Sequence, residues 1–277
     1  MNTEYLNLRA ALEPLYGEGE ARAIAFLILE DAFGLSRTDI YVGKVRQFSV
    51  DERIRLQTMC EQLKAGVPVQ YVLGQAWFCG RVFEVTPAVL IPRPETEELV
   101  AWAAEQISCN RILDAGTGSG CIAVSLKLQL PDSQVEAWDI SAEALAVAQR
   151  NAERLGAGVR FVRQDLLGAW NEDEVFDLIV SNPPYICERE RAEMEHHVLD
   201  HEPGTALFVP DDDALLFYRA LAEHAVAGAL REGGRLMVEI NSAYGPETAA
   251  LFERCGLHGV ELRKDEFGND RMVCGVR

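Results

Sequence analysis

Helical and strand-like segments alternate along the chain from Pro94 onward, and this alternation restricts the fold to one broad class. It is typical of a mostly parallel sheet with helices on both faces. The last two strands follow one another without a helix, which predicts an antiparallel pair at one edge. We predict an α/β fold with a doubly wound, mostly parallel seven-stranded sheet. The expected helices span 95–107, 119–129, 141–155, 212–231 and 246–255, and the expected strands span 111–114, 135–139, 159–163, 175–181, 234–240, 258–264 and 271–276.

Two shorter parts precede this region. Residues 1–66 carry apolar side chains at helical spacing, which predicts a small helical domain. Residues 67–91 are rich in Val, Tyr, Trp and Phe and are interrupted by Gly74 and Gly80, which predicts a β-hairpin that connects the helical domain to residues 92–277.

Composition limits the cellular setting. The chain has 277 residues, of which 48% are hydrophobic and 25% charged, as in soluble globular proteins. No apolar run is long enough to span a membrane, and the first residues lack the basic start of a signal peptide, so we expect a cytoplasmic protein with no membrane contact. The seven cysteines are odd in number and never form a Cys-x-x-Cys pair, which argues against a disulfide framework or a zinc site.

Charge argues against a nucleic-acid substrate. The net charge is −18, and residues 71–277 account for −16 of it, with 18 Lys/Arg against 34 Asp/Glu. Affinity for phosphate backbones comes mainly from Lys and Arg, so a body this acidic repels them.

Asn182-Pro183-Pro184-Tyr185 follows directly on the apolar strand 175–181. Because proline has no N–H and pushes the residue before it toward extended geometry, the two prolines end the strand. Asn182 offers one acceptor and two donors, nearby backbone carbonyls offer further acceptors, and Tyr185 offers a flat face. This set suits a planar –NH2 group, although a Pro-Pro after a strand is also common in plain turns.

A second cluster lies where the first strand of the sheet meets its helix. Asp114-Ala-Gly116-Thr117-Gly118-Ser119-Gly120 predicts a ligand-binding loop at the carboxyl end of that strand. The spacing also fits the dinucleotide fingerprint Gly-x-Gly-x-x-Gly/Ala, so it does not by itself decide the ligand. Asp139 ends the second strand and is placed to accept hydrogen bonds from ribose hydroxyls, because Ser141 is the better helix cap.

Two acids favour S-adenosylmethionine over a dinucleotide. Asp114 stands before the glycines, where a carboxylate suits a cationic ligand better than a pyrophosphate. Asp165 ends the third strand, where it could reach an adenine amino group while Leu166 packs on the ring, and a plain turn aspartate is the alternative.

In this order, these motifs resemble those of class I methyltransferases that methylate amino or amide nitrogen. Three further segments narrow the resemblance to the protein-(glutamine-N5) methyltransferases that act on peptide chain release factors. They are Gln70-Tyr-Val-Leu-Gly74, Leu90-Ile-Pro-Arg-Pro-Glu-Thr-Glu97 and Glu202-Pro-Gly-Thr-Ala-Leu207.

The resemblance implies that the substrate is the glutamine of a Gly-Gly-Gln loop in a release factor, which enters between the small and large domains. It implies that the glycine loop and Asp139 hold S-adenosylmethionine, that Asn182 and Pro183 bind the glutamine amide, and that Arg93 and Glu95 border the substrate entrance rather than forming only a cap and salt bridge. The product would be S-adenosylhomocysteine. The family often has an aromatic residue where this chain has Leu166. We expect a monomer.

The remaining residues suggest less. His196 and His197 could suggest a metal site, but adjacent helical residues point in different directions, so we expect none. The acidic stretch 188–202 is expected to be a solvated loop or helix face, with contact to the substrate protein as the alternative. The alternatives are a methyltransferase acting on nucleic-acid amino groups, an NAD-dependent oxidoreductase, which would leave Asn182-Pro-Pro-Tyr185 without a role, and a non-catalytic cofactor-binding scaffold.

Overall fold

The computed structural model describes residues 2–43, 48–105, 110–171, 174–194 and 196–277. The chain forms two compact units. The smaller contains residues 1–75 and 195–201, and the larger contains residues 76–194 and 202–277.

The smaller unit is helical, as predicted. Its helices are α1 (Thr3–Asp31), α2 (Arg37–Tyr41), α3 (Val50–Lys64), α4 (Val69–Leu73) and α8 (His196–His201). Ser36 and Ser49 begin α2 and α3 through capping boxes, in which each serine and an acid three residues later bond each other's backbone N–H. Side chains of α1, α2 and α3 form a continuous apolar core, which shows why this part of the chain can fold around its own centre.

The prediction of a hairpin over 67–91 is wrong at its start. Residues Val69–Leu73 form a helix instead of a strand, and Gly74, in the left-handed conformation at φ 71°, ends it. Val69, Val72 and Leu73 pack against the helical core, so tertiary contacts override the strand propensity of this Val/Tyr-rich run.

The hairpin itself is shorter than predicted. Strands β1 (Gln75–Phe78) and β2 (Arg81–Glu84) pair as a two-stranded sheet. The turn between them has φ 47° at Cys79 and φ 70° at Gly80, the two positive values that a tight type I′ turn requires. Phe78 and Phe83 belong to the core of the larger unit and meet edge to face.

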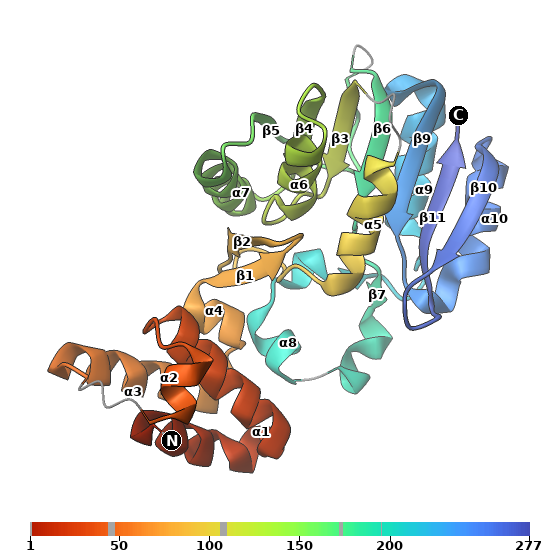
Figure 1. The fold of residues 1–277 in the computed structure, drawn as a ribbon. Coiled ribbons are helices and arrows are strands. Elements are labelled where there is room, and N and C mark those ends of the chain that lie inside the picture. The colour runs from red at the N-terminus through yellow and green to blue at the C-terminus, as the bar shows by residue number, and fades with distance from the viewer. Residues whose placement is uncertain (1, 44–47, 106–109, 172–173, 195) are drawn as a thin grey trace. The chain divides into compact units, whose positions relative to one another are not determined.

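The larger unit contains the predicted seven-stranded sheet (Figure 1). Its order is β10-β11-β9-β6-β3-β4-β5, with parallel pairing among β9, β6, β3, β4 and β5 and antiparallel pairing of β11 with β9 and β10. The antiparallel edge pair therefore confirms the prediction. The strands are β3 (Arg111–Ala115), β4 (Gln134–Asp139), β5 (Val159–Arg163), β6 (Phe176–Ser181), β9 (Leu230–Glu239), β10 (His258–Lys264) and β11 (Asp270–Val276).

Both faces of the sheet are apolar and covered. Neighbouring residues of a strand point to opposite faces, so Ile112 joins one core cluster and Leu113 joins the other. Helices α5 (Pro94–Ala104), α6 (Cys121–Gln129) and α7 (Ala142–Leu155) contribute to the first cluster, and α9 (Leu216–His224) and α10 (Gly245–Cys255) to the second. The sheet is thus doubly wound.

The largest differences from the predicted boundaries lie at α9 and β9. The helix expected over 212–231 spans Leu216–His224 and ends in a π-helical turn, Ala225–Ala229, and β9 begins earlier than expected, at Leu230. The segment between β6 and α9 also holds short elements: β7 (Ile186–Cys187) pairs with β8 (Phe208–Val209), and the 3₁₀ turns η1 (Glu188–Glu193) and η2 (Gly204–Ala206) lie between them in the chain. A further 3₁₀ turn, η4 (Ser242–Tyr244), precedes α10. Among the described residues, no helix combines the length and apolar character needed to cross a membrane.

Candidate active site

A cavity of about 390 Å³ lies in the larger unit. Its walls include the residues that follow β3, β4, β5 and β6. The strand order reverses between β3 and β6, because β4 and β5 lie on one side of β3 and β6 lies on the other. Such a switch point at the carboxyl ends of parallel strands is where open α/β sheets bind ligands. Of the residues predicted for the site, those on the wall are Arg93, Gly116, Thr117, Gly118, Ser119, Asp139, Asp165, Leu166, Asn182 and Pro184.

The glycine loop is held by backbone hydrogen bonds to the neighbouring strand. The N–H groups of Gly116 and Thr117 both donate to the Trp138 carbonyl at 2.9 Å. Gly116, Gly118 and Gly120 have φ values of 81°, 52° and 80°, which glycine adopts without strain. A Cβ at Gly118 would have no heavy atom within 4 Å, so this part of the loop faces open space that a ligand could fill.

Gly120 has a different role from the other loop glycines, because it does not line the cavity. A Cβ there would lie 3.0 Å from the Cβ of Ala148 in α7. The glycine therefore allows α6 and α7 to approach closely at the start of α6, and its predicted contact with the cofactor is not supported by this position.

Asp114 lies behind the loop rather than on the cavity wall. Its Oδ2 accepts hydrogen bonds from Thr117 Oγ1 at 2.6 Å and from the N–H of Ala123 at 3.0 Å. Burial, only partly offset by these bonds, raises the pKa of this carboxyl to about 7. Asp114 thus organises the loop, and any effect on a cation in the cavity is electrostatic rather than a direct contact.

Asp139 connects the ends of two strands. Its Oδ2 accepts from the N–H of Gly118 and its Oδ1 from the N–H of Ser141, both at 2.9 Å. Ser141 caps α7 by accepting from the N–H of Ala144, as predicted. Burial raises the pKa of Asp139. Each carboxylate oxygen can accept more than one hydrogen bond, so the side chain can still receive hydroxyl groups from the cavity.

The residues after β5 form a third part of the wall. Asp165 is exposed, and its Oδ1 accepts from the N–H of Leu167 at 2.9 Å, the turn role that the sequence left open beside a ligand role. Leu166 is buried next to the glycine loop, with its Cδ1 3.6 Å from where a Cβ of Gly116 would lie. Ile140 is half exposed and also lines the cavity. Ile140 was not predicted as a site residue, although an apolar residue directly after the acidic end of a strand could have indicated it.

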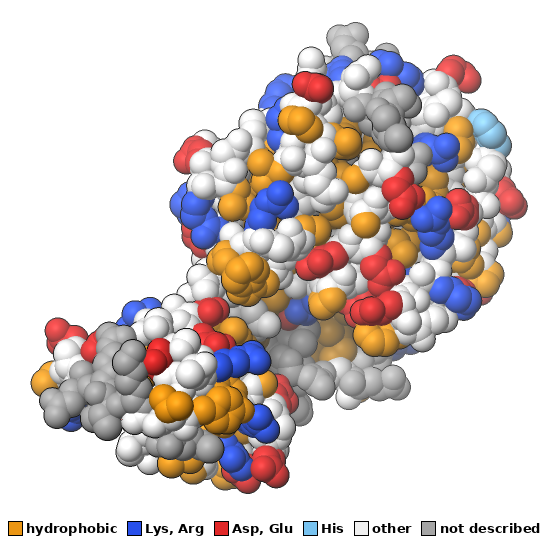
Figure 2. Space-filling view, in the orientation of Figure 1, with side chains coloured by type: hydrophobic (Ala, Val, Ile, Leu, Met, Phe, Trp, Pro, Cys, Tyr) orange, Lys and Arg blue, Asp and Glu red, His pale blue; other side chains and the backbone are white. Residues whose placement is uncertain are grey.

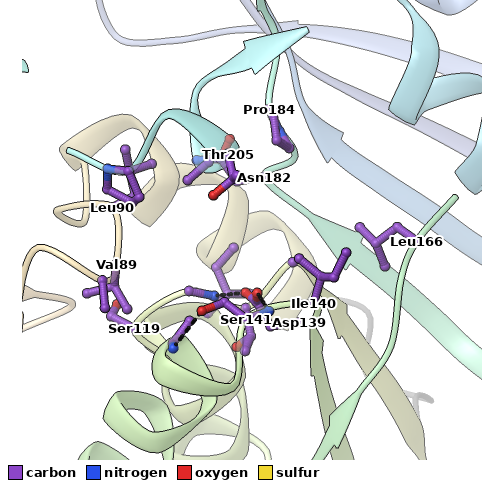
Figure 3. A pocket seen from close by; sticks show the side chains of 18 of the residues that line it. Val89, Leu90, Ser119, Asp139, Ile140, Ser141, Leu166, Asn182, Pro184 and Thr205 are labelled. Carbon is purple, nitrogen blue, oxygen red and sulfur yellow. Dashed lines mark hydrogen bonds between the residues drawn. The ribbon is translucent and has the colours of Figure 1, made fainter. Parts of the chain in front are cut away.

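Asn182 and Pro184 lie across the cavity from Asp139, Ile140 and Ser141 (Figure 3). Asn182 directly follows β6, as the two prolines predict, and its Nδ2 donates to Thr96 Oγ1 at 3.2 Å. Thr96 Oγ1 in turn donates to Glu239 Oε2 at 2.6 Å. Neither Thr96 nor Glu239 was predicted as a site residue, although Thr96 lies within the segment 90–97.

Pro183 and Tyr185 are next to Asn182 in the chain but do not line the cavity. The sequence predicts Tyr185 against a substrate amide, but its hydroxyl donates to Glu239 Oε1 at 3.3 Å and its ring packs on the core of the sheet. Burial and the Glu239 carboxylate raise the pKa of this phenol, so it stays protonated. The structure therefore places Tyr185 as support for the site rather than as a direct contact.

Arg93 combines a place on the cavity wall with an ion pair, but its side chain makes no capping hydrogen bond to α5. It lines the cavity, and its guanidinium binds Glu202 Oε1 at 2.6 Å. Glu202 is buried and also accepts from the N–H of Ile91, which corrects the prediction that the whole stretch 188–202 is solvated. Glu95 lies in the first turn of α5 and is not on the cavity wall. The ion pair between Arg93 and Glu202 joins two segments of the wall that are distant in the chain. Further wall residues follow Glu202 and were not predicted as site residues: Pro203, Thr205, Ala206, Phe208 and Phe217.

Figure 2 shows acidic and basic side chains interspersed over the visible face of the larger unit. In the described part of the chain, no three His, Cys, Asp or Glu side chains are grouped to hold a metal ion, and the side chains of His196 and His197 lie outside what is described.

The donor and acceptor set fits a nucleoside bearing a cationic group. Two carboxylates, Asp139 and Asp165, reach the cavity as hydrogen-bond acceptors. Leu166 and Ile140 add apolar surface suited to a flat ring. The open space over Gly118 admits close approach to the backbone. No cluster of Lys or Arg for a pyrophosphate lines this wall, where Arg93 is the cationic residue among the described ones.

Comparisons with known proteins agree with this geometry. Two protein families match the chain, the PrmC N-terminal domain over residues 7–74 and the methyltransferase small domain over residues 96–203. A release factor glutamine methyltransferase from Bacteroides thetaiotaomicron is 47% identical over 100% of both chains, and one from Flavobacterium psychrophilum is 41% identical over 95% of this chain and 94% of the relative. The catalytic domain of hMettl16, solved in complex with MAT2A 3′UTR hairpin 6, shares the fold alone, with a TM-score of 0.58, 16% identity and 85% of each chain covered.

Proposed function

The chain belongs to the release factor glutamine methyltransferases, and from this premise we propose that it methylates the side-chain amide nitrogen (N5) of a glutamine in a release factor. The glutamine is that of the Gly-Gly-Gln loop, and the modification supports translation termination. S-adenosylmethionine is the cofactor. The observation that carries the proposed mechanism is that Asn182, with its amide held by Thr96, lines the same cavity as Asp139 and the glycine loop.

The residues after β3, β4 and β5 would hold the cofactor. Gly116, Thr117, Gly118 and Ser119 offer backbone at the cavity wall, and Asp139 accepts ribose hydroxyls. The adenine would be received by three further residues, with Asp165 as a hydrogen-bond acceptor and Leu166 and Ile140 as apolar cover. When bound, S-adenosylmethionine supplies a methyl group on a positively charged sulfur, and S-adenosylhomocysteine is the product.

Asn182 has the task of making an amide nitrogen reactive. The lone pair of an amide nitrogen is delocalised into its carbonyl, which makes it a poor nucleophile. If Asn182 Oδ1 and the backbone carbonyl of Pro183, which follows it in the chain but is not on the cavity wall, accept the two N–H groups of the glutamine, the glutamine must reach past the wall at this turn. Its nitrogen is then polarised and held in one orientation. Positive charge that develops on this nitrogen is stabilised more in the transition state than in the ground state. The methylated nitrogen then loses a proton to water, so no strong base is required.

Three further assignments belong to the same proposal. Arg93 and Pro184 contact the substrate side of the cavity, which their place on its wall supports. Residues 1–66 recognise the release factor, which the PrmC N-terminal domain match supports. The protein acts as a cytoplasmic monomer without nucleic acid or a membrane, in keeping with a translation-factor substrate.

The alternatives from the sequence are less well supported. An NAD-dependent oxidoreductase would leave the Asn182 side of the cavity without a role and would bind a pyrophosphate beside a wall with a single cationic side chain among the described residues. A nucleic-acid substrate would have to approach a region with a net charge of −16.

The decisive experiment uses tritiated S-adenosylmethionine, the purified protein, a release factor and the same release factor with the loop glutamine changed to alanine. We expect label in the first release factor and none in the second. Equal labelling of both would reject the amide as the acceptor, and label in neither would reject the proposed function. Equilibrium binding of S-adenosylmethionine and NAD in parallel separates the two cofactors.

A further inference from the structure

We propose that Thr96 and Glu239 are positioning residues that set which end of the Asn182 amide faces the substrate. This inference rests on the proposed function, because it assigns the orientation that the proposed mechanism requires. Thr96 lies on α5, Asn182 follows β6 and Glu239 ends β9, so three elements of the larger unit meet at one chain of hydrogen bonds.

An asparagine side chain can present either its oxygen or its nitrogen after a half-turn about its last bond. Only the oxygen can accept the N–H of a substrate amide, whereas the nitrogen would place donor against donor. The orientation of the Asn182 amide therefore decides whether it can bind the substrate amide. Without a partner that distinguishes the two ends, both orientations would be populated.

Thr96 distinguishes the two ends because its single hydroxyl proton is already committed. The hydroxyl donates to Glu239 Oε2 at 2.6 Å, a short bond of the kind made to an ionised carboxylate. Oγ1 can then act only as an acceptor toward Asn182, and it receives Nδ2 at 3.2 Å. With Nδ2 bound in this way, Oδ1 is the end left for the substrate.

Glu239 is held in place for this role. It is 1% exposed, and its other oxygen accepts the Tyr185 hydroxyl at 3.3 Å. The charged groups near it are Arg271 on β11, which favours its ionised form, and Glu95 on α5, which opposes it. The phenol of Tyr218 on α9 is also buried nearby and protonated, since its pKa is raised.

The charge of Glu239 predicts a pH dependence. Burial raises its pKa to about 6, so the carboxyl gains a proton as the pH falls through that value. A protonated carboxyl can donate to Thr96 Oγ1, which frees the threonine proton to bond Asn182 Oδ1 and turns the amide the wrong way. We therefore expect kcat of the wild type to fall below about pH 6.

The main test compares two substitutions at one position. Thr96→Val keeps the shape but removes the hydroxyl, and we expect kcat for release factor methylation to fall about tenfold, on the scale of a lost orienting contact. Thr96→Ser keeps the hydroxyl and should retain at least half of the wild-type kcat. The affinity for S-adenosylhomocysteine, measured by calorimetry, should stay within about twofold in both.

Thr248→Val is the matched control, since Thr248 is a buried threonine on α10 whose hydroxyl donates to the Tyr244 carbonyl and which does not line the cavity. It should reduce thermal stability by a similar amount with kcat unchanged. Wild-type kcat in Thr96→Val would overturn the proposal. So would a loss of S-adenosylhomocysteine affinity in Thr96→Val as large as its loss of kcat, because that would indicate a general structural role.

Two further measurements complete the test. Glu239→Gln should lack the fall in kcat below about pH 6, and persistence of that fall would overturn the assignment to Glu239. The side-chain NH2 signal of Asn182 in ¹⁵N NMR, assigned with Asn182→Ala, should show slowed hydrogen exchange in the wild type and not in Thr96→Val. The NMR result needs no substrate, so it tests the hydrogen-bond chain even if the wild type fails to methylate a release factor.

Discussion

The two sides of the cavity are built in different ways. On the cofactor side, Asp139 accepts a hydrogen bond from the N–H of Gly118, which is 21 residues away in the sequence, and backbone N–H groups of the glycine loop bond the adjacent strand β4. On the amide side, Asn182 depends on Thr96, which is 86 residues away in the sequence, and Thr96 depends on Glu239, which is 143 residues away.

This difference separates binding from orientation. Backbone groups cannot change their identity under substitution, so the cofactor side should tolerate side-chain changes outside its glycines, Asp114 and Asp139. The amide side relies on three side chains that are linked one to the next by hydrogen bonds, so the loss of any one should affect turnover more than cofactor affinity. The following predictions test this contrast, from the largest effect to the smallest.

Asn182→Ala should have the largest effect. It removes the acceptor proposed for the substrate amide, and the loss of one oriented group in a transition state lowers turnover by about two to three orders of magnitude. S-adenosylhomocysteine affinity should change little. Steady-state kinetics with a release factor measures the turnover, and calorimetry measures the affinity for S-adenosylhomocysteine. The control is Asn269→Ala, in the turn between β10 and β11 and away from the cavity wall. A loss of cofactor affinity as large as the loss of turnover would remove the contrast between the two sides.

Gly120→Ala and Gly118→Ala should destabilise the protein to different extents, because the two glycines are required for different reasons. Both positions have positive φ, but only a Cβ at Gly120 would meet Ala148, at 3.0 Å. We expect Gly120→Ala to lower the free energy of unfolding by roughly 2–3 kcal/mol and Gly118→Ala by about 1 kcal/mol, because the second change adds backbone strain without a steric clash. Urea unfolding without cofactor measures both. Equal destabilisation would show that the close approach of α6 and α7 is not the reason for glycine at position 120.

Asp139→Ala should weaken cofactor binding about tenfold to a hundredfold, the scale of hydrogen bonds made by a charged group. The change also leaves the N–H groups of Gly118 and Ser141 without their acceptor. The kcat value at saturating S-adenosylmethionine should fall much less than the affinity. Asp212→Ala, at an exposed aspartate away from the cavity wall, serves as the control for removing one negative charge.

Tyr185→Phe should have the smallest effect. The phenol makes one long hydrogen bond to the Glu239 carboxylate and does not line the cavity, so it can act on Asn182 only through Glu239 and Thr96, and we expect kcat to fall by about two- to fivefold. A decrease as large as that of Asn182→Ala would restore the direct role that the sequence predicts for this residue.

Much of the fold was predictable from local pattern. The alternation of helix and strand after Pro94 predicted the seven strands and the antiparallel edge, because buried parallel strands and amphipathic helices have distinct periodicities. The error at Val69–Leu73 has the opposite cause. This short run has strand-like composition, and only packing on the helices of the smaller unit makes it helical.

The candidate site was predicted in part for the same reason. Gly116, Gly118, Asp139 and Asn182 stand at strand ends, where sequence position alone predicts exposure to a ligand. Asp114 and Tyr185 also stand near strand ends, but they lie behind the wall, because the direction of a side chain depends on its neighbours in space. Thr96 lies in the segment 90–97 that carries part of the family resemblance, but neither this segment nor the sequence around Glu239 indicates that the two side chains meet Asn182.

The amino-acid sequence by itself determined where the backbone stops, bends and comes close to a ligand, since glycine and proline impose those geometries locally. It also carried the motifs by which the family can be identified. Tertiary structure alone decided that Glu239 and Thr96 meet Asn182, and hence which end of the amide faces the cavity. A hydrogen bond has a direction only once its donor and acceptor are brought together, and here the fold brings them from three separate elements.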